Sequence, residues 1–98
     1  MGRVTTPDMS AHEIVVTGRV QGVGFRWYTR DAAARLGLAG WVANLPDGSV
    51  AVEVSGTAIA IENFLSALRD GPPGAFVSEL RTAPIDPARI RVTHFEIR

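Results

Sequence analysis

Three glycines, at positions 18, 22 and 24, separate a run of β-branched residues from the start of a helical pattern. Residues 16–26 (VTGRVQGVGFR) therefore predict a strand, a tight loop and a helix in direct succession. Glycine lets the main chain come close to a bound group, and the first N–H groups of a helix lack partners within the helix. Arg26 adds a planar fork of donors that suits a phosphate or a carboxylate. We interpret this segment as an anion cradle, with glycines of purely steric role as the alternative.

The remaining patterns predict the rest of the fold. Strands are expected at residues 12–19, 38–45, 50–55 and 76–83, and helices at residues 25–36 and 57–70. The turn Leu45-Pro-Asp-Gly48 joins the second and third strands in a hairpin. Residues 90–97 read as a short extra strand whose phase changes near Thr93, through a bulge or a break. The order β-α-β-β-α-β predicts an α+β, ferredoxin-like sandwich: an antiparallel sheet with two helices on one face and a short extra C-terminal strand.

The length of 98 residues fits one domain, which we expect to span residues 12–98. Residues 1–11 show no periodicity, so we expect a disordered N-terminal extension, and residues 1–8 could precede an alternative start at Met9. No segment has the length of a signal peptide's apolar region or of a membrane span. We therefore expect a soluble, cytoplasmic protein that does not bind membranes, and the small neutral domain gives no reason to expect more than a monomer.

Composition excludes several kinds of chemistry. All ten basic residues are arginines, so neither a phosphate-binding lysine nor a Schiff base is possible. The sequence has no cysteine, which excludes disulfides, thiol nucleophiles and cysteine zinc sites. The two histidines are too few for a metal site unless carboxylates complete it, and we expect no metal. The formal charge is zero, whereas a nucleic-acid-binding domain is usually basic, so we expect no nucleic-acid partner.

Asn44 is the second residue with chemical potential, because it lies at the end of a predicted strand that can face the glycine loop. A polar residue beside a turn is the plainer alternative. An arginine, an amide and main-chain N–H groups cannot act as a general base, but they can orient water and stabilise charge. An acyl phosphate needs little more, because its carboxylate leaves without protonation and phosphoryl transfer has a loose transition state. The other candidates are weaker. Trp27 and Trp41 could stack on a ligand, but we expect partial exposure for Trp27 and core packing for Trp41. We expect Glu53 on the solvent-exposed face of its strand, a structural or surface role for His94, and His12 near a flexible end.

Two segments carry a family resemblance. Residues 16–26 resemble the first signature of the acylphosphatases, and Gly40-Trp-Val-Ala-Asn44, with Gly48, Val50 and Gly56 at the expected spacing, resembles the second. The resemblance covers residues 12–98. It implies hydrolysis of acyl phosphates to a carboxylate and inorganic phosphate, with no metal or cofactor. Arg26 and Asn44 would be catalytic, with Asn44 orienting the attacking water, and the phosphate would also be held by the main-chain amides of Gln21, Gly22, Val23, Gly24 and Phe25.

Two other functions remain open on the sequence. One is a non-catalytic phosphate-binding or anion-binding regulatory module, because ferredoxin-like domains serve many roles. The other is RNA binding on the sheet face, which residues 50–55 disfavour because they offer no aromatic side chains for base stacking.

Overall fold

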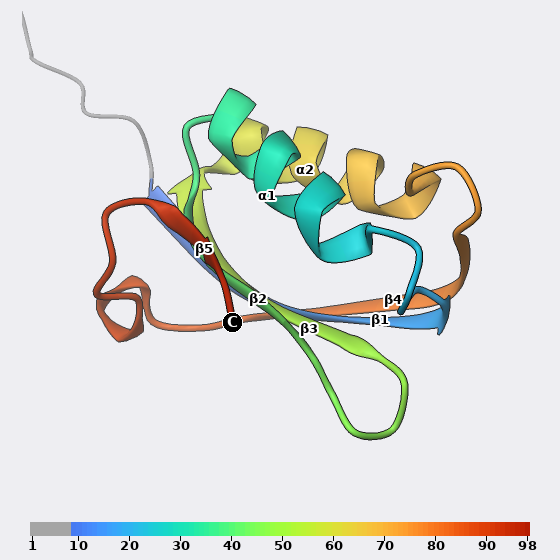
Figure 1. Ribbon diagram of the computed structural model, residues 1–98. Helices are drawn as coiled ribbons and strands as arrows, with labels where there is room; N and C mark the ends of the chain where they lie inside the picture. The colour runs from blue at the N-terminus through green and yellow to red at the C-terminus, as the bar shows by residue number, and fades with distance from the viewer. Residues whose placement is uncertain (1–8) are drawn as a thin grey trace, which may run out of the picture.

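A five-stranded sheet carries both α-helices on one face (Figure 1). The computed structural model describes residues 9–98. The strands lie in the order β4-β1-β3-β2-β5. In chain order the elements are β1 (Met9–Arg19), α1 (Phe25–Arg35), β2 (Ala39–Asn44), β3 (Val50–Thr57), α2 (Ala58–Asp70), β4 (Phe76–Pro84), the short 3₁₀ helix η1 (Pro87–Arg89) and β5 (Phe95–Ile97).

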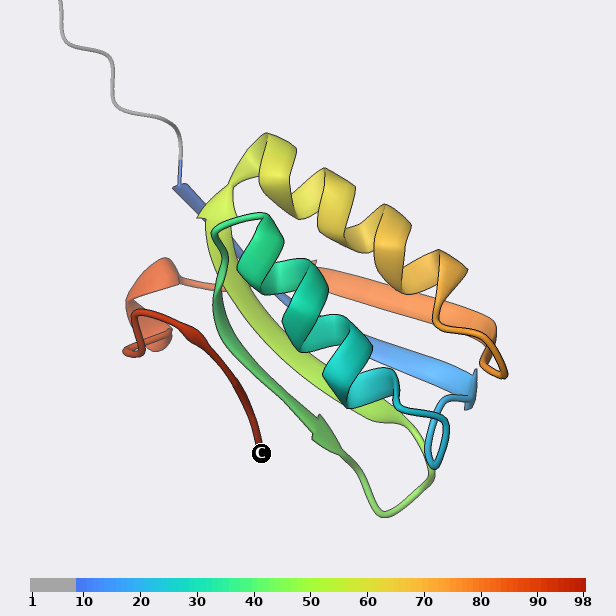
Figure 2. The ribbon, with the colours of Figure 1, turned by 45° about the horizontal axis from the view of Figure 1, so that its top comes forward.

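The hydrophobic core lies between the helices and the sheet, where α1 and α2 run side by side across the strands (Figure 2). Alternate residues of β3, namely Val50, Val52 and Val54, are fully buried, as the period of two in the sequence predicts. From α2, Phe64 meets Phe95 of β5 edge to face, with 5.9 Å between ring centroids. One contiguous core thus joins the central strands, α2 and the last strand.

The hairpin between β2 and β3 forms at the predicted turn. Leu45 N donates to Ser49 O at 2.9 Å, and Gly48 N donates to Leu45 O at 3.1 Å. The pairing places Asn44, the last residue of β2, opposite Val50, the first of β3. The position of Asn44 is therefore fixed by a sheet register and a tight turn.

The fold class predicted from the sequence is confirmed, with differences at both ends of the sheet. β1 begins at Met9, three residues earlier than predicted, and pairs from there with β3. The expected disorder of residues 1–11 is therefore wrong for residues 9–11, and residues 1–8 lie outside the described residues. β5 pairs with β2 in parallel, although the prediction was an antiparallel sheet. After β4, at one edge, the chain crosses the end of the sheet through η1 and returns along β2 at the other edge (Figure 1). The phase change near Thr93 therefore marks a break rather than a bulge.

The crossing segment also corrects the prediction for Glu53. Its side chain faces away from the helices, as expected, but the residue is only 8% exposed. Arg89 of η1 lies over it and pairs with its carboxylate at 2.8 Å. Trp41, expected in the core, is half-buried on β2 with the Arg98 guanidinium 5.2 Å from its ring centroid. Contacts from residues distant in the sequence thus cover the part of this sheet face that the sequence predicts to be exposed to solvent.

Candidate active site

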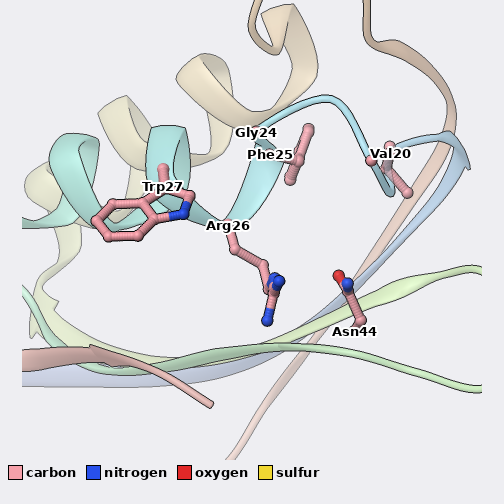
Figure 3. Close-up of a pocket in the computed structure, with 7 residues that line it drawn as sticks. Val20, Gly24, Phe25, Arg26, Trp27 and Asn44 are labelled. Atoms are coloured by element: carbon pink, nitrogen blue, oxygen red, sulfur yellow. The ribbon is translucent and has the colours of Figure 1, made fainter.

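A pocket of about 260 Å³ opens where the loop after β1, the start of α1 and the end of β2 meet (Figure 3). It brings together Arg26 and Asn44, the two side chains predicted to be catalytic. Of the predicted loop residues, Gly22, Gly24 and Phe25 line the pocket, whereas Gln21 and Val23 do not. The complete lining is Val20, Gly22, Gly24, Phe25, Arg26, Trp27 and Asn44.

The start of α1 has the geometry of an anion site. Its N-cap, Gly24, adopts a left-handed conformation (φ 77°), and within residues 9–98 no side chain caps the helix. The first helical hydrogen bond to this residue comes from Tyr28 N, at 3.0 Å, so the N–H groups of residues 25–27 precede it. The first turn also contains no acidic residue. The positive end of the helix dipole is therefore available to a bound anion.

Arg26, the second residue of α1, extends its guanidinium toward Asn44 (Figure 3). One of its nitrogens, Nη1, makes a long hydrogen bond of 3.4 Å to the main-chain oxygen of Arg98. In the described part of the chain it forms no ion pair with an aspartate or glutamate side chain, unlike Arg30, Arg81, Arg89 and Arg98. The Arg26 charge is thus directed into the pocket without an acidic side chain as its partner.

Asn44 faces the guanidinium from the opposite wall, at the exposed end of β2 (Figure 3). Among the described residues its side-chain amide makes no hydrogen bond, so both its oxygen and its nitrogen can contact a ligand or a water molecule. Because the backbone is fixed by the hairpin, only the side-chain rotamers of Asn44 are free to adjust. This combination of a rigid base and an unengaged amide suits a group that positions a small molecule.

The side chain of Gln21 has a role that sequence reasoning missed. Its Nε2 donates to Leu45 O at 2.8 Å and to Ser49 O at 2.9 Å. Both carbonyls belong to the hairpin turn next to Asn44. Gln21 therefore connects the glycine loop to the hairpin and fixes the position of one wall of the pocket relative to the other. No spacing in the sequence indicates which turn an amide in a loop will reach.

Hydrogen bonds within the hairpin turn stabilise its conformation. Asp47 accepts hydrogen bonds through Oδ1 from Ser49 N, at 2.9 Å, and from Ser49 Oγ. These two bonds favour the charged carboxylate and hold the pKa of Asp47 below its ordinary value. Ser49 is buried, and its carbonyl is one of the two that receive Gln21. The turn that carries Asn44 is thus held from two sides.

The two histidines lie outside this pocket and belong to no metal-binding cluster of the described residues. Within residues 9–98, no group of three His, Asp or Glu side chains is placed to hold a metal ion. His12 Nδ1 lies 3.3 Å from Thr82 Oγ1, and His94 lies 3.5 Å from the carboxylate of Glu96. Neither histidine lines the pocket. Of α1 and α2, the helices in the described range, neither is long and apolar enough to cross a membrane.

The sandwich fold and the glycine-led helix start define a class: an α+β, ferredoxin-like domain with a pocket at a helix start that is lined by an arginine and an asparagine. The family model for acylphosphatases matches residues 12–97, and the chain belongs to the acylphosphatase family. An acylphosphatase of Archaeoglobus fulgidus is 49% identical over 80 residues, which cover 80% of this chain and 90% of the relative.

Solved structures agree with this assignment. The crystal structure of acylphosphatase from Bacillus subtilis matches with a TM-score of 0.86 at 33% identity, over 91% of this chain and 98% of that chain. Full-length HypF, in a phosphate- and nucleotide-bound form, matches with a TM-score of 0.83 at 27% identity. That match covers 98% of this chain but 12% of HypF, so a similar fold also occurs inside a much longer protein.

Proposed function

We propose that this chain hydrolyses the carboxyl–phosphate bond of acyl phosphates, with Arg26, the loop amides and Asn44 as its catalytic apparatus. Its membership in the acylphosphatase family makes it a hydrolase. The observation that carries the proposal is the convergence of three features on one pocket: an uncapped helix start, an arginine without an acidic side-chain partner and an asparagine amide without a hydrogen bond among the described residues.

The phosphoryl group binds first, at the start of α1. Its oxygens accept hydrogen bonds from the Arg26 guanidinium and from main-chain N–H groups of residues 21–25, chiefly those of Gly22, Gly24 and Phe25, which line the pocket. Charge-assisted hydrogen bonds of this kind are about twice as strong as neutral ones. Because the loose transition state spreads charge over the same oxygens, donors that are already in place stabilise it without reorganisation.

Water then attacks phosphorus from the side of Asn44. The side-chain oxygen of Asn44 accepts a hydrogen bond from the water and directs its lone pair toward phosphorus. As the new P–O bond forms, the bond from phosphorus to the acyl oxygen breaks, and its electron pair leaves with the carboxylate. The proton of the water passes to the phosphate product or to solvent. No general base is required, because the carboxylate departs readily and the nucleophile contributes little to bond formation at the transition state.

The activity is tested by hydrolysis of benzoyl phosphate and acetyl phosphate by the pure protein in excess chelator. We expect turnover of both substrates, with phosphate as a competitive inhibitor. A protein that is stabilised by phosphate against thermal unfolding but hydrolyses neither substrate would instead be a non-catalytic phosphate-binding module, which is the second candidate function.

Replacement of Asn44 separates orientation of water from binding of phosphate. For Asn44→Ala we expect kcat to fall on the order of 10²-fold, since misplacement of one reactant by an ångström costs about that much. The inhibition constant of phosphate should change less than threefold. A collapse of phosphate affinity in this variant would make Asn44 a binding residue and contradict the proposed role.

We also propose that the enzyme acts as a monomer in the cytoplasm. A single copy of the chain already brings Arg26 and Asn44 together in one pocket, so the proposed mechanism uses no residue of a second copy. The absence of cysteine means that the chain does not depend on an oxidising compartment for disulfides. Size-exclusion chromatography with light scattering, at a range of protein concentrations, tests the oligomeric state. Cell fractionation tests the location.

A further inference from the structure

Trp27 is a large aromatic residue at the rim of the pocket that the proposed mechanism does not use. It follows Arg26 on α1, and its side chain is 57% exposed. A tryptophan exposes its indole to water at a cost, because burial of an aromatic side chain is strongly favourable. Three other large apolar residues within residues 9–98 are similarly exposed, namely Met9, Ile59 and Phe76. Of these four, Trp27 is the one that lines the pocket.

The indole is held on one side by a cation. The guanidinium carbon of Arg30, one helical turn further along α1, lies 4.2 Å from the ring centroid of Trp27. Such a contact is favourable even at exposed sites and restricts the rotamers of both side chains. Arg30 Nη2 also lies 3.8 Å from the carboxylate of Asp31. The Arg30 guanidinium therefore covers one face of the Trp27 indole and restricts its orientation, and the remaining surface of the indole can contact a ligand.

The in-line geometry of the proposed reaction places the leaving acyl group on the side of the pocket where Trp27 lies. In phosphoryl transfer the attacking and leaving oxygens lie roughly in line through phosphorus. If water attacks from the side of Asn44, the acyl group leaves on the side away from Asn44. Figure 3 shows Trp27 and Asn44 on opposite sides of the Arg26 guanidinium, and both line the same pocket. The pocket volume of about 260 Å³ also exceeds what one phosphoryl group and one water need, since a water occupies about 30 Å³ in the liquid.

We propose that Trp27 forms the acyl-group subsite of this enzyme and favours acyl phosphates whose acyl group is flat and aromatic, with Arg30 as a positioning residue for the indole. This inference rests on the proposed function, because it takes the in-line geometry from that mechanism. An aromatic acyl group stacks on or against the edge of the indole, whereas an acetyl group is too small to cover it.

Kinetics with two substrates test the subsite. For Trp27→Ala we expect kcat/KM for benzoyl phosphate to fall about two- to tenfold, mainly through KM, and kcat/KM for acetyl phosphate to change less than twofold. Trp27→Phe should restore most of the preference. Arg30→Gln should lower the benzoyl preference by a smaller factor. Ile59→Ala, which removes an exposed apolar side chain from α2 outside the pocket, should change neither substrate. Equal losses for both substrates in Trp27→Ala, or no loss, would overturn the proposal.

Binding of inert isosteres separates this inference from the proposed function. In phenacylphosphonate and acetonylphosphonate a methylene group replaces the bridging oxygen of benzoyl and acetyl phosphate. We expect the phenacyl compound to bind more tightly and to shift the indole N–H resonance of Trp27, in a protein that carries Trp41→Phe so that one tryptophan remains. If the wild-type protein hydrolyses no acyl phosphate yet shows this difference, the proposed function fails and the subsite stands. If both isosteres bind equally and leave the resonance unchanged, the subsite fails whatever the activity.

Discussion

The two helices of this domain lie side by side on the same face of the sheet, but they begin in opposite ways. α2 starts after Thr57, whose backbone is extended and whose Oγ1 accepts a hydrogen bond from Ala60 N at 3.2 Å. α1 starts after the left-handed Gly24 and has no side-chain cap within the described residues. A side-chain cap is worth about 1 kcal/mol. The fold therefore leaves one helix start without this stabilisation, and that helix start is the one that lines the pocket.

The second residue of each helix sharpens the contrast. Arg26 in α1 and Ile59 in α2 occupy the same position relative to their helix starts, and neither first turn contains an acidic residue. Arg26 faces the pocket, whereas Ile59 is exposed to solvent on the capped helix. The comparison teaches that two helices with similar electrostatics can differ in function through the presence or absence of one capping hydroxyl and one directed charge.

The largest expected effect separates these two second residues. Arg26→Ala should lower kcat/KM for benzoyl phosphate by 10²–10³, or about 2.7–4 kcal/mol, by analogy with the loss of one donor to a transition-state oxyanion. Ile59→Ala, the matched control, should leave kcat/KM unchanged. Steady-state kinetics on both variants, with thermal melts to check folding, make the measurement. Full activity in Arg26→Ala would contradict the role of the guanidinium.

The next effect concerns the two hydrogen bonds that connect the loop before α1 to the hairpin. Gln21→Leu keeps the size of the side chain but removes the donors to Leu45 O and Ser49 O. Each carbonyl retains one main-chain donor, so the loss should be that of two ordinary hydrogen bonds, about 1–3 kcal/mol in the free energy of unfolding. We also expect a lower kcat, because the loop and the hairpin that carries Asn44 are no longer tied. Asn63→Leu, at an exposed amide of α2, is the control and should cost less than about 0.5 kcal/mol. An unchanged kcat in Gln21→Leu would show that the tie only stabilises the fold.

Substitution of the two N-cap residues themselves tests the comparison directly. At Gly24 an added methyl group meets no atom within 4 Å, so Gly24→Ala should cost only the left-handed conformation, about 1–2 kcal/mol. Thr57→Ala should cost about 1 kcal/mol through loss of the cap. Urea unfolding measures both. The two variants should differ in their response to phosphate: Thr57→Ala should keep the full phosphate-induced rise in Tm, and Gly24→Ala should lose part of it. An equal response in both would argue against binding at the start of α1.

The smallest effect is on the pH dependence of stability and comes from the hairpin. The folded-state pKa of Asp47 is lowered by its hydrogen bonds from Ser49, so the stability that its charge contributes is present above the unfolded pKa of about 3.9 and is lost as pH falls through the lower folded value. Asp47→Asn keeps an acceptor oxygen but does not titrate. The stability difference between wild type and Asp47→Asn should therefore be constant from pH 7 to 5 and shrink below pH 4, as measured by urea unfolding. A difference that grows toward low pH would contradict the assignment.

Local patterns in the sequence predict the parts of the molecule that depend on neighbouring residues. The alternation of Val50, Val52 and Val54 gives the buried face of β3, and the turn at residues 45–48 gives the hairpin. The glycine pattern before Arg26 predicts a loop and a helix start, and the structure places Arg26 and Asn44 in one pocket. These features are readable because turn residues and side-chain periods act over a few positions along the chain.

Features that depend on contacts between residues far apart in the sequence cannot be predicted from local patterns. Glu53 has the pattern of a solvated residue, and it is covered only because the segment after β4 crosses the sheet and brings Arg89 over it. The three residues of β5 carry too short a pattern to show that they pair in parallel with β2. The donors of Gln21 find partners 24 and 28 positions away. In each case the outcome depends on where the chain returns, which no local pattern specifies.

The parallel pairing of β5 with β2 has a consequence for folding kinetics. Gly40 pairs with Phe95, so this part of the sheet closes only after a loop of more than half the chain has lost its entropy. Topologies rich in such pairings fold slowly, on a scale of milliseconds to seconds, whereas helices form in about a microsecond. Arg98, which follows β5, contacts Arg26 through its main-chain oxygen. We therefore expect the environment of the Arg26 side chain to be completed late, by the slow closure of the sheet, after the helix that carries it has formed.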